Sequence, residues 1–437
     1  MSTTAPERPA TTPIIASPSI DETAVTASGS APIEANGHDA DFSFTPVPAS
    51  ARHGFWAVGF VMLGFTFFSA SMSVGAKIGN GLDLGGFVWA TTLGGLVLAI
   101  YTGGLAYLGA KTGMGLDLLA RRAFGRRGSL LASALVGLTQ MGWFGVGVAM
   151  LGIPVADLLH ISPWWIVIAA GAAMTASAYF GMKAIEIVSF VSVPLIAILG
   201  TYSMVTATSK AGGLVEVFGG GSMPIVTGIG MVVGSFISGG TATPNFTRFA
   251  RSAKVAVITT VIAFFLGNTL MFSFGAVGGA FTGKDDIFYV MIAQGLAIPA
   301  ILVLGANIWT TNNNALYTSG LGFSNITRVR TRPMTLIAGI FGTVSALWLY
   351  DNFVGWLSFL NAALPPIGAI LIADFLVRKH AYVDSSEAEQ TVAWHAVLGV
   401  IAGGLVGYFV PWGISAINAV AVAVAIHLVG VALTKRR

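Results

Sequence analysis

The chain has 437 residues, of which 55% are hydrophobic and 9% are charged, and its mean hydropathy is +0.80. A soluble chain carries about 25% charged residues, so this composition excludes a soluble globular protein and indicates one that lies in a lipid bilayer. The absence of cysteine excludes disulfides and thiolate metal sites. The formal net charge of +4 is accounted for by the basic loops of a membrane protein, and we expect no nucleic-acid partner.

The first 50 residues are rich in Ala, Ser, Thr and Pro and contain no apolar run. Such a composition predicts a disordered tail. The tail lacks the basic segment and apolar core of a secretory signal. A membrane transport domain is predicted to follow, from residue 51 to residue 437.

About twelve apolar stretches in this domain are long enough to cross a bilayer as helices. They are 54–80, 84–109, 129–152, 163–181, 184–207, 223–245, 254–281, 287–317, 335–350, 353–377, 393–410 and 412–434. An even number places both termini on one side. Nineteen of the 22 Lys and Arg residues fall on that side, and only Lys77, Lys210 and Lys284 fall on the other. The positive-inside rule therefore predicts cytoplasmic termini.

The sixth span, 223–245, contains the run GSFISGG, which is unusual for a transmembrane helix. Its glycines weaken the helix, while Ser235 and Ser238 bring hydroxyl groups to mid-membrane depth. One interpretation is a broken helix with a polar pocket at the break, as transporters use to bind their cargo. The other is a Gly/Ser-rich helix that packs closely on its neighbours.

The first span shows a weak similarity to the sixth when Gly64 is aligned with Gly234. Because the two spans lie five apart, the halves that they begin would have opposite topology in the membrane. Paired interrupted segments in inverted halves are a sequence signature of a transporter binding site.

Two further spans carry polar groups at helical spacing. Gln140 and Trp143 lie three residues apart in the third span and so share a helix face. Asn307, Thr310 and Thr311 follow the i, i+3, i+4 spacing in the eighth span and place oxygens on one face. Uncharged oxygens of this kind can bind Na⁺, although hydrogen bonding between helices is the alternative.

The middle of the spans near these clusters contains no Asp or Glu. Proton-coupled pumps usually keep a carboxylate or His relay in the membrane, so sodium coupling is favoured over proton coupling. Neutral polar groups beside aromatic faces predict a neutral, planar cargo. Six scattered His residues and no Cys supply no catalytic constellation, so we do not expect an enzyme.

Several strings in the chain carry a resemblance to a known family. They are SARHGFWAVGFVMLGFTFFSAS, YLGAKTG, TQMGWFGVGVAM, VVGSFIS, AFFLGN, MIAQGL, NIWTTNNNALY and WLYDNFVGWL. The chain resembles the bacterial cytosine permeases of the nucleobase–cation symport family (NCS1), from about Pro46 to near its C-terminus. The resemblance implies an all-α fold with a five-plus-five inverted repeat like that of the leucine transporter. Repeat one would cover about 54–207 and repeat two about 223–377, with extra helices at about 393–434.

The resemblance also implies sodium-coupled uptake of cytosine across the cytoplasmic (inner) membrane by alternating access, with broken helices 1 and 6. Carried over by position, the sodium site of the family falls on three backbone carbonyls and two hydroxyls. The carbonyls belong to Gly64, Phe67 and Asn307, and the hydroxyls to Thr310 and Thr311.

The nucleobase site of the family resembles a sandwich of Trp143 against Phe236. Gln140, Ser235 and Ser238 match its polar positions and would bond the edge of the ring. Stacking would orient a flat base, and directional hydrogen bonds would choose among bases.

The chain departs from the family pattern at Asn245 and Asn313, where many members carry Asp. Fine base selectivity is therefore open. The alternatives that remain are a proton-coupled transporter and a transporter of another nucleobase or of a hydantoin-like ring. A channel is the alternative outside this class.

Overall fold

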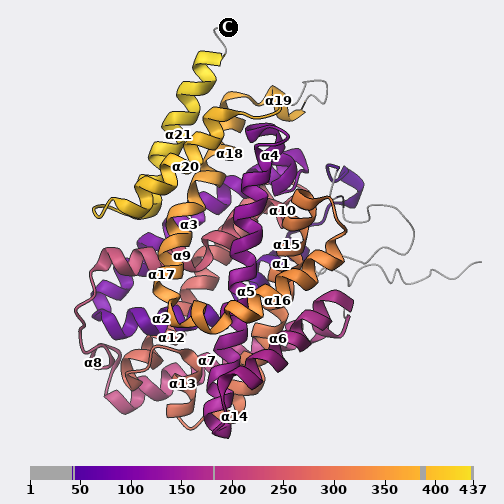
Figure 1. Cartoon of the computed structure of the whole chain (residues 1–437). Coiled ribbons are helices and arrows are strands. Elements are labelled where there is room, and N and C mark those ends of the chain that lie inside the picture. Colours follow the sequence, from indigo (N-terminus) through magenta and orange to yellow (C-terminus); the bar gives the residue numbers. More distant parts are fainter. Residues whose placement is uncertain (1–41, 43–44, 181–182, 384–389, 435–437) are drawn as a thin grey trace, which may run out of the picture.

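The computed structural model describes residues 42, 45–180, 183–383 and 390–434, which are almost entirely helical (Figure 1). Most of the predicted tail, 1–50, lies outside the described residues. Ordered contacts begin before its predicted end, because Val47 is buried and its N–H donates to the carbonyl of Gly113 at 2.8 Å.

Each predicted apolar stretch coincides with one helix or with consecutive helices. The first stretch contains α1 (Phe55–Thr66) and α2 (Ser69–Gly81), and the next five each contain one of α3 (Leu84–Thr112), α5 (Ser129–Leu159), α6 (Pro163–Phe180), α7 (Lys183–Ala211) and α9 (Ile225–Thr241). The seventh contains α11 (Ala253–Val261), η3 (Ile262–Gly267) and α12 (Asn268–Thr282). The eighth contains α13 (Ile287–Ala293), α14 (Ala297–Pro299), η4 (Ala300–Leu304) and α15 (Gly305–Thr327). The last four contain α16 (Thr331–Asp351), α17 (Phe353–Ala363) with α18 (Pro365–Val377), α20 (Trp394–Phe409) and α21 (Ser415–Thr434). Shorter helices are α4 (Leu116–Phe124), α8 (Leu214–Val217), α10 (Pro244–Thr247) and α19 (His380–Val383).

Six of the described helices are long and apolar enough to cross a membrane, and the bent pair α1 and α2 makes a seventh candidate. Helices α9 and α20 are apolar but shorter. The predicted class, an all-α polytopic membrane protein, is confirmed. The number of twelve spans stays a prediction.

The first broken helix lies where the chain passes from α1 to α2, which meet at an angle of 51°. Of the two interpretations of the sixth span, the structure agrees with a closely packed helix and not with a break within GSFISGG. Helix α9 is continuous through this run and ends at Thr241, and a turn at Ala242 and Thr243 leads into α10. The glycines of the run instead allow close packing: a Cβ at Gly234 would lie 2.6 Å from the carbonyl oxygen of Leu357 on α17.

Figure 1 shows that different short helices lie at the two ends of the molecule. Helices α4, α10 and α19 lie at the end where α21 finishes, and α8, α13 and α14 lie at the opposite end. Two of the three lysines that were predicted to lie away from the termini, Lys77 and Lys284, belong to this opposite end. Lys77 of α2 pairs at 3.7 Å with Asp285, the neighbour of Lys284. We call the end where α21 finishes the terminal end and the opposite end the far end.

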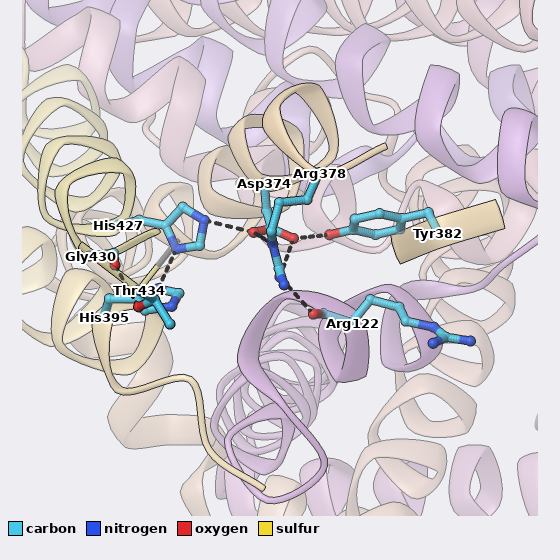
Figure 2. A network of polar contacts seen from close by, with 8 residues as sticks. All are labelled: Arg122, Asp374, Arg378, Tyr382, His395, His427, Gly430 and Thr434. Carbon is cyan, nitrogen blue, oxygen red and sulfur yellow. Dashed lines mark hydrogen bonds and ion pairs between the residues drawn. The ribbon is translucent and has the colours of Figure 1, made fainter. Parts of the chain in front are cut away.

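A buried ion-pair network joins α18, α19, α20 and α21 at the terminal end (Figure 2). The fully buried carboxylate of Asp374 accepts hydrogen bonds from Arg378 at 2.8 Å and Tyr382 at 2.6 Å, and lies 3.0 Å from His427. His427 contacts His395 of α20 at 3.1 Å, and Arg378 also donates to a backbone carbonyl of α4. Because a buried charge is tolerated only when it is paired, this network fixes the last two helices against α18.

Helices α2 and α12 pack with their backbones in direct contact. A Cβ at Gly75 would collide with the carbonyl of Phe272, and a Cβ at Gly275 would collide with that of Met72. Small residues are what allows membrane helices to approach so closely. This contact holds the second half of the broken first helix.

We expect Gly275→Ala to prevent correct folding, because its methyl group can be accommodated only if α2 and α12 separate. The monodisperse fraction of detergent-solubilised protein on size-exclusion chromatography should fall severalfold. Gly355→Ala on α17 is the matched control, since a Cβ there meets no atom within 4 Å. Equal monodisperse fractions for the two variants would contradict this account of the packing.

Candidate transport site

One side chain of α15 forms hydrogen bonds with the backbone on both sides of the break between α1 and α2. Phe67 and Phe68 leave the helical conformation, and Phe68 is extended. The amide of Asn307 spans the gap: its Nδ2 donates to the Phe67 carbonyl at 2.9 Å, and its Oδ1 accepts from the Ser69 N–H at 2.9 Å. Broken backbone at membrane depth must find such partners within the protein.

The break also changes the partners of carbonyl oxygens at the end of α1. In an uninterrupted helix the Phe68 N–H would bond the Gly64 carbonyl, and the next N–H would bond that of Phe65. Here the Phe68 N–H bonds the Thr66 carbonyl at 2.9 Å, and the Ser69 N–H bonds α15. The carbonyls of Gly64 and Phe65 have therefore lost their helical partners at the negative end of the α1 dipole, which favours a cation.

The predicted hydroxyls of α15 lie beside Asn307. Those of Thr310 and Thr311 donate to the Asn307 carbonyl at 2.9 and 3.0 Å, and their lone pairs remain as acceptors. The structure thus connects four of the five predicted sodium residues through Asn307, and the fifth, Gly64, lies in the last turn of α1. Neutral oxygens from a helix end and two hydroxyls fit a hard monovalent cation.

Two of the three predicted polar groups of the nucleobase site, Gln140 and Ser238, meet where α5 faces α9. Gln140 Nε2 donates to Ser238 Oγ at 2.8 Å, and Thr139 Oγ1 lies 2.8 Å from the same oxygen. Ser235 instead donates to the carbonyl of Val232 on its own helix at 2.7 Å. These side chains are buried.

The aromatic residues of the site are arranged around Phe68. Its ring lies edge-on to Trp143, with centroids 6.1 Å apart, and edge-on to Phe236 at 6.5 Å. Trp143 and Phe236, the predicted sandwich, therefore border one cluster and share Phe68 as a neighbour. On the terminal side of this cluster, Phe65 packs between Phe236 at 5.4 Å and Phe246 at 5.0 Å.

A cavity of about 380 Å³ lies on the far side of the same cluster, and we call it the vestibule. Its wall includes Phe353, whose ring lies 6.0 Å from that of Trp143. The remaining lining residues are Ser73, Lys77, Met150, Asp157, Lys284, Asp285, Asp286, Tyr289 and Tyr350. The aromatic cluster thus has a cavity on its far side and packed rings on its terminal side.

Residues 46–435 match the family described as permeases for cytosine/purines, uracil, thiamine and allantoin. The chain belongs to this family.

Relatives and solved structures agree with this assignment. The permease is 51% identical to the cytosine permease of Escherichia coli K12 over 386 residues, which cover 87% of this chain and 92% of the relative. It is 25% identical to the hydantoin permease of Microbacterium maritypicum over 394 residues, which cover 80% of this chain and 78% of that one.

The fold is similar to that of Mhp1. The inward-facing conformation of Mhp1 matches with a TM-score of 0.77 at 19% identity and covers 90% of this chain and 93% of its own. Mhp1 in a closed conformation with bromovinylhydantoin bound, described as a nucleobase-cation-symport-1 family transporter, matches with 0.74 at 21% identity, covering 90% and 95%. The prediction of a transporter and not an enzyme is confirmed, and so is the leucine-transporter-like fold.

Three features of the permease site were missed by sequence reasoning. Phe68 follows the predicted Phe67 directly, but nothing in its type distinguishes it as the central ring. Thr139 is adjacent to Gln140 and could have been found only if the helix were known to turn both toward α9. Asn307 was predicted as a carbonyl ligand, whereas its side chain also holds the broken helix.

The vestibule contains a carboxyl group with a shifted pKa. Asp286, in the loop before α13, accepts hydrogen bonds from the Phe288 N–H at 2.8 Å and the Tyr350 hydroxyl at 2.9 Å. Burial raises the pKa of this carboxyl from 3.8 to about 6, although the two hydrogen bonds act in the opposite direction. Between pH 4 and pH 6 the folded state therefore binds a proton that the unfolded state has released.

We expect the titration of Asp286 to make the stability of the folded protein depend on pH. A raised carboxyl pKa contributes stability that is present below pH 4 and is lost as the pH rises through 6, by about 3 kcal/mol. Asp286→Asn is neutral at every pH, so its melting temperature relative to the parent protein should rise between pH 4.5 and pH 8. Asp351→Asn, which changes an exposed carboxyl on α16, is the control. A difference between parent and Asp286→Asn that stays constant over this range would refute the prediction.

Proposed function

We propose that this permease imports cytosine together with sodium across the cytoplasmic membrane, with both termini in the cytoplasm. The observation that carries the proposal is the break between α1 and α2. It frees carbonyls at the end of α1, is held by the side chain of Asn307 on α15, and places Phe68 in a buried aromatic cluster. One interruption thus contributes to an oxygen-rich site and to a site for a planar ring.

The choice of cytosine rests on the site and on the relatives. Aromatic rings and neutral hydrogen-bonding groups favour a flat, uncharged heterocycle. The cytosine permease of Escherichia coli is 51% identical over most of both chains, whereas the hydantoin permease is 25% identical. Cytosine is therefore favoured over a hydantoin as the cargo.

The choice of sodium rests on the oxygen set of Gly64, Phe67, Asn307, Thr310 and Thr311. These residues would hold the ion, which supplies positive charge that draws the end of α1 and the face of α15 together. The chain itself positions the oxygens: the Asn307 amide fixes the break, and its carbonyl orients both threonine hydroxyls. A proton-coupled mechanism would use a carboxylate at this place, and the set contains none.

In the mechanism that we propose, cytosine enters through the vestibule and passes Phe353 to stack on Trp143 against Phe236. Ser238 and Gln140 exchange part of their mutual hydrogen bond for the edge of the ring. Packing of Phe65 against Phe246 blocks the terminal side until the far side closes. Rearrangement at the ends of α1 and α9 would then open the path to the cytoplasm.

Uptake of radiolabelled cytosine into proteoliposomes tests the proposal. At fixed pH, an inward sodium gradient should drive cytosine above its equilibrium level. Accumulation driven only by a proton gradient would refute sodium coupling, and simple equilibration would refute symport. The choice of cargo would be refuted if excess uracil or hydantoin inhibited the uptake of labelled cytosine more strongly than unlabelled cytosine does.

Two substitutions should separate the sites. Trp143→Ala removes a stacking face and should raise the Kd for cytosine by roughly tenfold to a hundredfold, since base stacking contributes about 1–3 kcal/mol. Its sodium affinity without cytosine should not change. Trp348→Ala, which removes an exposed ring of α16, is the matched control.

Thr311→Ala removes one proposed oxygen ligand and should weaken sodium binding directly and cytosine binding through it. The sodium concentration for half-maximal uptake should rise severalfold. Thr327→Ala, at the exposed end of the same helix, should leave this concentration unchanged. If Thr311→Ala kept the sodium dependence of the parent permease, the proposed ion site would be wrong.

A further inference from the structure

Asn268 is a buried amide whose polar atoms are unpaired. It is the first residue of α12, it is 1% exposed, and neither its Nδ2 nor its Oδ1 has a hydrogen-bond partner among the residues that the structure describes. A buried unpaired amide is costly, because it has left water without a replacement. Such a group in a native structure calls for a partner, which a water, an ion or a ligand can supply.

A second unpaired polar group lies on the broken first helix, and helix register places it opposite Asn268. Helices α2 and α12 run parallel and in contact. Gly75 lies against Phe272, and one turn further along both helices Gly79 lies against Ala276. One turn before the Gly75 pair, the same register places Ser71 opposite Asn268. Ser71 is 1% exposed, and its hydroxyl likewise has no partner within the described ranges.

This pair lies next to the aromatic cluster of the transport site. Ser71 donates its N–H to the carbonyl of Phe68, the ring that contacts both Trp143 and Phe236. On the other helix, Phe264 lies one turn before Asn268 in the π-helical turn η3, with its ring 5.4 Å from that of Phe236. π-helical turns are frequent at functional sites because they redirect side chains.

We infer that Asn268, supported by Ser71, is a hydrogen-bonding residue of the nucleobase site and pairs with the edge of the ring. The inference rests on the proposed function. An amide presents a donor and an acceptor side by side, which matches a heterocycle that carries an adjacent acceptor and N–H donor. Cytosine carries such a pair at its ring nitrogen and exocyclic amino group.

The amide of Gln140 differs from that of Asn268 in its present partners. Gln140 Nε2 already donates to Ser238, so binding cargo there exchanges one hydrogen bond for another. At Asn268 the cargo would satisfy atoms that are otherwise unpaired, so each hydrogen bond formed is gained in full. A site of this kind discriminates strongly against rings that cannot fill it.

The test compares Asn268→Leu with the parent permease in two measurements. Without ligand, the melting temperature should stay equal or rise by a few degrees, because an apolar side chain of similar size replaces an unpaired amide. At saturating sodium, the Kd for cytosine should rise roughly tenfold to a hundredfold. A residue needed only for structure would show the opposite pair of results, a lower melting temperature and an unchanged Kd.

Ser71→Ala is the second variant and should raise the Kd for cytosine severalfold while the protein remains folded. Ser273→Ala is the matched control on α12, since its hydroxyl bonds its own helix at 2.8 Å. A cytosine Kd within twofold of the parent in both Asn268→Leu and Ser71→Ala would overturn the inference. A raised sodium Kd without cytosine would also overturn it, because it would assign the pair to a cation. The parent protein reports separately on the proposed function, which fails if the parent binds no cytosine.

Discussion

The structure depends on how the break between α1 and α2 is stabilised. Backbone groups that leave a helix within a membrane have no water to bond, so they must be satisfied by the protein. Asn307 does this from α15 with one amide that bonds both sides of the gap, to Phe67 and to Ser69. The close contact of α2 with α12 then holds the second half of the helix in place.

In the function that we propose, this arrangement places the ion site and the nucleobase site on one structural element. The end of α1 has carbonyl oxygens without helical partners, the hydroxyls of Thr310 and Thr311 bond the Asn307 carbonyl, and the ring of the extended residue Phe68 contacts both Trp143 and Phe236. A change of conformation at the break therefore affects both sites. An ion bound at the break would favour the conformation in which the rings are positioned for a planar cargo, which is the physical basis of coupling.

The sequence was informative where a feature depends on composition or helical spacing. Apolar runs located the helices, and the i, i+3, i+4 spacing of Asn307, Thr310 and Thr311 identified a polar face that the structure places at the break. The resemblance implied a broken first helix, but the residue types alone do not locate the break. Phe67 and Phe68 are not helix-breaking residues, and their conformation depends on the amide of Asn307, which is 240 residues away. The glycines of α9 were compatible with a break or with close packing, and the structure shows close packing, as at Gly234 against Leu357.

The coupling of the two sites through the break is tested most directly by reciprocal titration of the purified permease. Cytosine binding is measured over a range of sodium concentrations, and sodium binding is measured with and without saturating cytosine. Linkage requires each ligand to tighten the other by the same factor, which for typical couplings is about 5 to 150. We predict a factor in this range in both directions. A cytosine Kd that does not depend on sodium would contradict the account.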